Sequence, residues 1–350
     1  MFAPEQKRKS SIPETHVRFD GEMLFEKMAG LEWIETDGLG GYASATVCGM
    51  HTRRYHGLLM CALNPPLGRF LFLSRMEEKL IADGEEFELA TNRYPGTVSP
   101  QGWRLLRSFH IDPFPRFVFE AGGVRLEKTV FMMRGRQAVM VRYRALGPRG
   151  GELPADKRKS ISLIVRPFFA FRGEHCLARE HGGLRATPLG GTLTVSLDGG
   201  PGIPDCVLHH DGWDFHPAAC WYRNFEYEAE RERGLDWRED LFSPGELVSN
   251  FSAGTASLLA SVERQARVAV SRRHAPSLEK SWTMLRDQER ERREALLGGF
   301  GGSTGAVRRL VLSADAFIVE RGDGASVIAG YPWFGDWGRD AMISLPGLTV

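Results

Sequence analysis

The sequence contains few cysteines, almost no net charge and no long apolar run. Its five cysteines are odd in number and widely spread, which argues against a disulfide framework. The polar N-terminus lacks the apolar segment of a secretory signal, and no run of about eighteen apolar residues is present to span a membrane. We therefore expect a protein of the reducing cytoplasm, without a membrane partner.

Charge balance and missing motifs exclude further functions. The 45 basic and 44 acidic residues give a net charge of +1, so we expect no nucleic-acid partner. No H-E-x-x-H motif is present, which leaves zinc protease chemistry without support, and we interpret the glycine-rich residues 298–305 as a linker. The glycines of residues 37–42 lack the lysine of a P-loop, so we interpret them as turn residues before a strand.

Most of the chain has the pattern of antiparallel β structure. Between about residues 23 and 270, short runs of β-forming residues alternate with glycine and proline, without regular helices between them. This pattern predicts a mainly β fold with a large antiparallel sandwich. The predicted strands are 42–47, 56–62, 70–72, 116–119, 124–132, 138–143, 161–168 and 192–197. Residues 147–159 should form an exposed loop between two strands.

The pattern becomes helical after Ala275. Ser277 is a predicted N-cap for a charged connecting helix that ends at Gly298–Gly299. A second, amphipathic helix closes at Gly322, with an apolar stripe at Val307, Leu310, Val311, Ala314, Phe317 and Ile318. We divide the chain into a flexible tail, a β-sandwich, a linker and the start of a helical domain, at 1–20, 21–272, 273–302 and 303–350. The last segment is too short to cover its own apolar stripe.

The densest chemistry lies in the segment YPWFGDWGRD, residues 331–340. Indole rings cover the apolar C–H face of a sugar, while carboxylates and arginine bind its hydroxyl groups. The predicted substrate-binding residues are Trp333, Asp336, Trp337, Arg339 and Asp340. Structural caps with buried tryptophans are the alternative interpretation.

The two aspartates of this segment are poor candidates for a catalytic pair. Their spacing of four predicts one helix face, with Cβ atoms about 5–6 Å apart. The acid and base of a glycosidase flank the scissile bond, which two neighbours on one turn do not easily do. Arg339 should hold Asp336 and Asp340 ionised, as hydroxyl binding requires.

Two other segments have functional and structural interpretations. Residues 48–61 contain histidines and cysteines that could bind zinc, but their spacing matches no zinc finger and favours a packed hairpin with hydrogen-bonded histidines. His209, His210 and His216 are weaker candidates, so we predict no metal site. Residues 221–241 combine aromatic rings with dense charge, which favours a loop toward a polar ligand cleft over a domain contact.

Three long segments together resemble the bacterial and archaeal glycogen debranching enzymes of the amylo-α-1,6-glucosidase type. They are LEWIETDGLGGYASATVCGMHTRRYHGLL at 31–59, WYRNFEYEAERERGLDWREDLFSPG at 221–245 and AGYPWFGDWGRDAMISLPGL at 329–348. The resemblance implies a galactose-mutarotase-like β-supersandwich, a connecting helix and the first helices of an (α/α)6 barrel.

The resemblance also implies an activity, which is hydrolysis of the α-1,6-linked glucose stub of glycogen or limit dextrin, with inversion. The implied partner is therefore an α-glucan, and no cofactor is needed. In the related six-hairpin glucosidases the W-x-R-D element binds the glucose at the cleaved bond. Residues 337–340 of this sequence resemble that element, so the resemblance implies that Trp337, Arg339 and Asp340 bind the glucose and that Asp336 and Trp333 support them.

In the family that the chain resembles, the catalytic acid and base come from later barrel helices. We therefore assign no catalytic residue to these 350 residues and expect the chain alone to be inactive. Two alternatives stay open. One is a non-catalytic glycan-binding module, and the other is a split subunit whose apolar stripe pairs with a separately encoded barrel.

Overall fold

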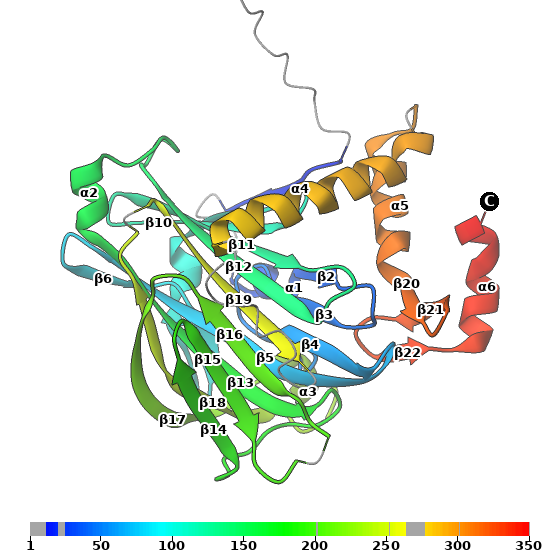
Figure 1. The fold of residues 1–350 in the computed structure, drawn as a ribbon, viewed down its shortest axis with the longest axis horizontal. Helices are drawn as coiled ribbons and strands as arrows, with labels where there is room; N and C mark the ends of the chain where they lie inside the picture. Colours follow the sequence, from blue (N-terminus) through cyan, green and yellow to red (C-terminus); the bar gives the residue numbers. More distant parts are fainter. Residues whose placement is uncertain are drawn as a thin grey trace, which may run out of the picture.

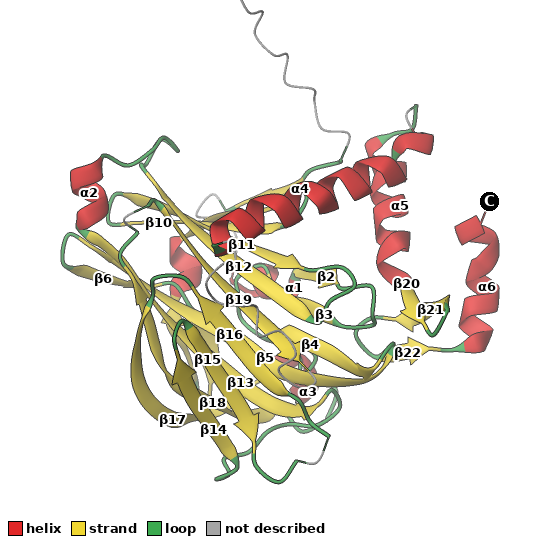
Figure 2. Cartoon of the chain, viewed as in Figure 1, coloured by secondary structure: helices red, strands yellow, loops and turns green. Residues whose placement is uncertain are grey.

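The computed structural model describes residues 12–19, 25–200, 202–251, 253–263, 277–300 and 302–349. Its largest elements are two antiparallel sheets (Figure 1; Figure 2). Much of the expected flexible tail lies outside the described residues. Residues 15–18 of the expected tail nevertheless form strand β1 (Thr15–Arg18), which pairs with Leu106–Ile111. The expectation that residues 1–20 are a flexible tail is therefore corrected at these residues.

The sheets contain nine and eight strands. In spatial order the first is β1, β9 (Leu106–Ile111), β10 (Pro115–Ala121), β11 (Val124–Met132), β12 (Ala138–Leu146), β19 (Thr255–Glu263), β16 (Asp205–His210), β15 (Thr192–Leu197) and β14 (Leu184–Leu189). The second is β17 (Asp214–Glu226), β18 (Arg238–Ser249), β13 (Ile161–Gly173), β5 (Leu67–Ala82), β4 (Gly57–Asn64), β3 (Tyr42–Thr46) and β2 (Glu32–Thr36), with β6 (Glu85–Glu88) beside β5. The smaller elements are α1 (Phe25–Gly30), β7 (Thr91–Tyr94), β8 (Thr97–Gln101) and the 3-10 turn η1 (Gly102–Leu105).

Each large sheet contributes one face to a shared apolar core. Leu59, Phe72 and Val165 of the eight-stranded sheet lie in the same buried cluster as Val130 and Val141 of the nine-stranded sheet. Successive side chains of a strand point to opposite faces, and β15 accordingly alternates between buried and partly exposed positions. The predicted mainly β, antiparallel fold is confirmed, and we call these two packed sheets the β-sandwich.

Three local predictions need correction. Residues 70–72 are a strand, as predicted, but the strand is the sixteen-residue β5, because charged residues that break its apolar run find partners on other strands, such as Glu78 with Lys128 at 2.6 Å. The predicted loop 147–159 ends in a short helix, α2 (Ala155–Lys159). Residues 221–241 are not one loop, because they contain the end of β17, the helix α3 (Glu228–Glu232) and the start of β18.

The connecting helix is α4 (Leu278–Leu296), which lies along the β-sandwich (Figure 1). The predicted N-cap is confirmed, since the Ser277 side chain accepts a hydrogen bond from the Lys280 backbone N–H at 3.4 Å. Trp282 is buried, and its ring lies 6.4 Å from that of Phe114 and 6.0 Å from that of Phe131. These contacts hold α4 on the sandwich. The 3-10 turn η2 (Gly298–Phe300) follows it.

Beyond the linker, helix α5 leads to a small sheet, from which helix α6 departs (Figure 1). The elements are α5 (Gly305–Phe317), β20 (Ile318–Arg321), β21 (Gly324–Gly330), β22 (Phe334–Asp336) and α6 (Gly338–Thr349). The three strands correct the expectation of a purely helical segment. Ile318, predicted in the helix, begins β20, because a β-branched pair precedes the turn at Gly322, whose φ is +57°.

The apolar stripe of α5 is partly uncovered. Val307 and Leu310 are 39% and 67% exposed, and Met342 and Ile343 of α6 are 68% and 73% exposed. Among the described residues, no helix is both long and apolar enough to cross a membrane.

A charged network holds α4 against both the sandwich and α5. Arg293 donates hydrogen bonds to Glu35 of β2 at 2.9 Å and to Glu289 at 2.8 Å. Arg292 donates to Glu289 and to Asp315 of α5, in the latter case at 2.7 Å. Because Glu35 and Glu289 are both buried, these arginines offset the cost of removing two carboxylates from water.

We expect Arg293→Ala to lower the free energy of unfolding by about 3 kcal/mol, because it leaves the buried carboxylate of Glu35 without its ion-pair partner. Urea unfolding measures this change. The matched control is Arg290→Ala on the same helix, whose pair with Glu294 is more exposed and should matter by less than about 1 kcal/mol. Equal effects of the two substitutions would contradict the proposed role of the network.

Candidate functional site

One arginine of the β-sandwich holds the chain on either side of Trp333. Arg69 of β5 donates hydrogen bonds to three carbonyl oxygens, those of Pro332 at 3.1 Å, Phe334 at 2.9 Å and Gly40 at 2.8 Å. A guanidinium presents its donors in a fixed fork, so three carbonyl groups from distant segments are fixed together. Arg69 is 3% exposed, which keeps water from competing for these bonds.

Aromatic rings fill the junction around this arginine. The Arg69 guanidinium lies 4.8 Å from the ring centroid of Tyr331 and 5.6 Å from that of Tyr42. Tyr331 also packs against Phe317, the last residue of α5, at 5.6 Å between centroids. The sandwich and the segment that carries the predicted site are therefore joined by a buried cation and a cluster of rings.

The turn before β3 forms the floor of the junction. Asp37 is fully buried, and its Oδ1 accepts hydrogen bonds from the backbone N–H groups of Leu39 at 2.7 Å and Gly41 at 2.9 Å. The predicted glycine turn is confirmed at Gly40, which has a φ of +93° and no room for a Cβ, since that atom would lie 2.4 Å from the Pro66 carbonyl oxygen.

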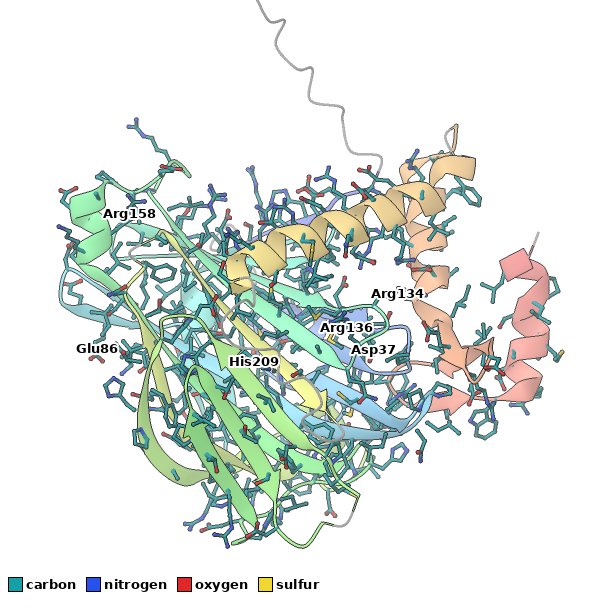
Figure 3. All side chains as sticks on the ribbon, viewed as in Figure 1. Asp37, Glu86, Arg134, Arg136, Arg158 and His209 are labelled. Carbon is teal, nitrogen blue, oxygen red and sulfur yellow. The ribbon has the colours of Figure 1, made fainter. Side chains whose placement is uncertain are left out.

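This side of the sandwich faces the small sheet. Asp37 and Arg134 both lie there, and Arg134 is near α5 (Figure 3). The Arg134 guanidinium reaches Asp315 and the Ile318 carbonyl oxygen, each at 3.5 Å, and the Glu320 backbone N–H donates to the Gly38 carbonyl oxygen at 2.9 Å. The contacts of Arg69 are thus one part of a broader junction.

A cavity of about 310 Å³ opens between the β-sandwich and the start of α6. Trp337 is 53% exposed and Phe334 is 50% exposed, so both rings are available to a ligand. The polar wall of the cavity, Glu174 and His175, comes from the connection that follows β13. The lining residues are Pro66, Leu67, Gly68, Arg69, Glu174, His175, Trp333, Phe334, Gly335 and Trp337.

Two of the five predicted site residues, Trp333 and Trp337, line this cavity. The Arg53 guanidinium lies 5.4 Å from the Trp333 ring centroid, and the Tyr55 ring packs against the same indole at 6.4 Å. Arg339 is exposed and lies 6.0 Å from the ring centroid of Trp337. A sugar on Trp337 would therefore be near a cation that can donate hydrogen bonds.

The two aspartates are arranged differently from the prediction. Asp336 is the last residue of β22, whereas Asp340 lies in the first turn of α6, so they do not share one helix face. Asp336 is paired with Arg321 of β20, and Asp340 lies 3.5 Å from Arg339. The prediction that Arg339 holds both carboxylates was therefore wrong, because hairpin pairing of β22 brings Asp336 to another arginine. Each aspartate retains one buried oxygen that makes no hydrogen bond to the described residues.

The sequence reasoning missed the polar wall. Glu174 Oε2 accepts a hydrogen bond from Arg69 at 3.3 Å, and its Oε1 lies 3.8 Å from His175 Nε2. Burial raises the pKa of Glu174 above its usual value, against the opposing effect of Arg69. The only sequence signal was a polar Arg-Gly-Glu-His run directly after an apolar strand, and this signal does not indicate which surface the run faces.

The segment 48–61 supports the site through packing. His56 Nδ1 accepts a hydrogen bond from the Thr52 backbone N–H at 3.1 Å, and its Nε2 lies 3.5 Å from Glu32. His51 is buried, and its Nδ1 makes no hydrogen bond to the described residues, so the expectation of hydrogen-bonded histidines holds only in part. Burial lowers the pKa of both histidines and favours their neutral forms. In the described part of the chain, no group of three metal-ligand side chains comes together.

Residues 221–241 approach the same place through α3. Arg54 donates hydrogen bonds to Glu230 at 3.3 Å and to the carbonyl oxygens of His175 and Asp236, each at 2.8 Å. The backbone N–H of Ala229 donates to the Thr52 carbonyl oxygen at 3.0 Å. The three sequence segments that carry the family resemblance are therefore linked through Arg54, Tyr55 and Trp333, and the third of them lines the cavity. His209 of β16 lies elsewhere on the sandwich (Figure 3).

Comparisons with known proteins divide the chain into the β-sandwich and the segment that follows the linker. Residues 31–257 match the family model described as glycogen debranching enzyme N terminal, and residues 312–350 match the model described as amylo-alpha-1,6-glucosidase. No curated protein matches the chain. One similar solved structure is a bacterial glucoamylase complexed with acarbose, at 6% identity and a TM-score of 0.40, with 87% of this chain and 44% of that chain covered. The chain thus spans less than half of that protein's length. Because the first family model covers more than half of the residues, the chain belongs to the glycogen debranching enzyme family.

Proposed function

We propose that the chain is the N-terminal portion of a glycogen debranching enzyme that hydrolyses the α-1,6-glucosidic branch stubs of glycogen or limit dextrin. The observation that carries this proposal is the cavity at Trp333 and Trp337, which lies where the two matched family segments meet. A cavity lined by both aromatic rings and charged groups suits a ligand with apolar C–H faces and a rim of hydroxyl groups.

The proposed domain organisation follows the family. Residues 21–272 are a galactose-mutarotase-like supersandwich, residues 273–302 are the linker, and residues 303–350 begin an (α/α)6 barrel. Support for the last assignment comes from α5 and α6, whose uncovered apolar side chains need further helices to pack against. This packing is proposed within one polypeptide, and no observation favours a separately encoded barrel.

The proposed glucosyl site consists of the five predicted residues. Trp337 stacks on the sugar, while Arg339 and Asp340 bind its hydroxyl groups. Trp333 forms the side of the cavity, and Asp336 acts indirectly, because its ion pair with Arg321 fixes the β22 end from which Trp337 projects.

The reaction requires a general acid that protonates the glycosidic oxygen and a general base that activates water. Asp336 is held in an ion pair with Arg321, and Asp340 lies 3.5 Å from Arg339, so neither carboxyl is positioned as a free general acid. Glu174 has a raised pKa, but it is also bonded to Arg69. We therefore propose no catalytic residue among these three carboxylates.

We expect the 350-residue chain to release no glucose from a branched limit dextrin above the rate of a boiled control. A coupled glucose assay with purified chain measures this rate. Release of glucose would contradict the assignment of the acid and base outside these residues.

A further inference from the structure

The cavity has a second wall that belongs to the β-sandwich. Glu174 and His175 follow β13 and line the same cavity as Trp333 and Trp337. The Glu174 side chain is 16% exposed and that of His175 is 63% exposed, so the carboxylate is recessed and the imidazole is open. Both are therefore within reach of a ligand that enters from solvent.

The backbone of this wall is fixed in position. The Glu174 N–H donates to the Arg69 carbonyl oxygen at 3.1 Å, and the Arg54 guanidinium donates to the His175 carbonyl oxygen at 2.8 Å. The Tyr55 hydroxyl lies 3.2 Å from His175 Nδ1, which leaves Nε2 on the side of Glu174. Two polar side chains are thus pre-positioned, so little ordering accompanies ligand binding.

The wall also retains hydrogen-bonding capacity. Glu174 Oε2 accepts a hydrogen bond from Arg69 at 3.3 Å, whereas the contact of Oε1 among the described residues is the longer one of 3.8 Å with His175 Nε2. A carboxylate accepts several hydrogen bonds, and imidazole both donates and accepts. Hydroxyl groups that alternate donor and acceptor roles suit this pair better than an anion, which Glu174 would repel.

We propose that Glu174 and His175 bind the hydroxyl groups of a glucosyl unit, so that the β-sandwich supplies one wall of the α-glucan site. This inference rests on the proposed function and extends it, because the glucosyl unit on Trp337 is then held from both domains. The cavity volume of about 310 Å³ lies at the lower end of the range for small-molecule sites and suits one or two sugar rings.

The test is a titration of the purified 350-residue chain with maltotetraose, in which binding is measured by tryptophan fluorescence and by isothermal calorimetry. We expect Glu174→Gln to weaken binding about tenfold, because it removes a charged acceptor while keeping the side-chain shape. His175→Ala should weaken binding about three- to tenfold. Because the His175 side chain is exposed, His175→Ala should fold normally, so a loss of binding in this variant cannot be attributed to misfolding.

Matched controls come from the same connection. Glu180→Gln and His181→Ala alter an exposed carboxylate and an exposed histidine outside the cavity lining, and both should bind as the wild type does. Trp337→Ala tests the proposed function itself and should abolish the fluorescence change and the binding.

The outcomes separate the two claims. If Glu174→Gln and His175→Ala bind like the wild type while Trp337→Ala does not bind, the sandwich wall has no role and the proposed function stands. If Trp337→Ala binds normally, the proposed glucosyl site is wrong. If the wild-type chain shows no binding at concentrations up to about 10 mM, both claims are overturned.

Discussion

Replacing Arg69 with alanine is expected to lower the free energy of unfolding by about 3–5 kcal/mol and to abolish α-glucan binding. The substitution leaves the carbonyl groups of Gly40, Pro332 and Phe334 without their shared donor and leaves Glu174 beside an empty space. Because Pro332 and Phe334 flank Trp333, their release also removes the support of the cavity wall.

Urea unfolding and maltotetraose titration measure the two effects of Arg69→Ala. Arg69→Lys keeps the charge but not the planar fork, so it should restore part of the stability and little of the binding. The matched control is Arg166→Ala on β13, whose ion pair with Glu246 is partly exposed and should contribute less than about 1 kcal/mol. The anchoring role fails if Arg69→Ala and Arg166→Ala behave alike.

The second large effect is a pH dependence that Asp37→Asn should remove. Burial raises the pKa of Asp37 to about 7, against the hydrogen bonds from the Leu39 and Gly41 backbone. In the unfolded chain an aspartate titrates near pH 4. Between about pH 4 and pH 7 the folded chain therefore binds more protons than the unfolded chain, so stability falls as pH rises through this range and is level above it.

The expected loss is about 4 kcal/mol, from three pKa units at about 1.4 kcal/mol each. In Asp37→Asn the amide oxygen still accepts both backbone hydrogen bonds, and no charge develops in the interior. The substitution should therefore be nearly neutral at pH 4 and stabilising above pH 7. Urea unfolding across this range measures the difference, with Asp83→Asn on an exposed, lysine-paired aspartate as the control. A difference from the wild type that does not change with pH would contradict a buried, titrating Asp37.

The sequence predicted what depends on neighbours along the chain. The antiparallel strands, the Ser277 cap and the glycine turn at Asp37 follow from local patterns of apolar residues, side-chain caps and backbone geometry. The sequence also singled out the indole pair at Trp333 and Trp337, which line one cavity, while their role in sugar binding stays a prediction.

What the sequence did not predict depends on contacts between distant segments. The spacing of four between Asp336 and Asp340 is compatible with one helix and also with a strand followed by a helix. The pairing of β22 with β21, which the local sequence does not indicate, decides between these two structures. The polar wall was missed because Arg69 and Glu174 lie far apart in sequence and meet only when β5 pairs with β13. Their partners at Pro332 and Phe334 lie farther still along the chain.

The most direct test of the proposed site is a crystal structure of the 350-residue chain soaked in maltotetraose. We predict electron density for a glucosyl ring stacked on Trp337, with hydroxyl groups within hydrogen-bonding distance of Arg339 or Asp340. An empty cavity, with sugar bound only on the outer faces of the sheets, would contradict the account and favour a glycan-binding sandwich instead.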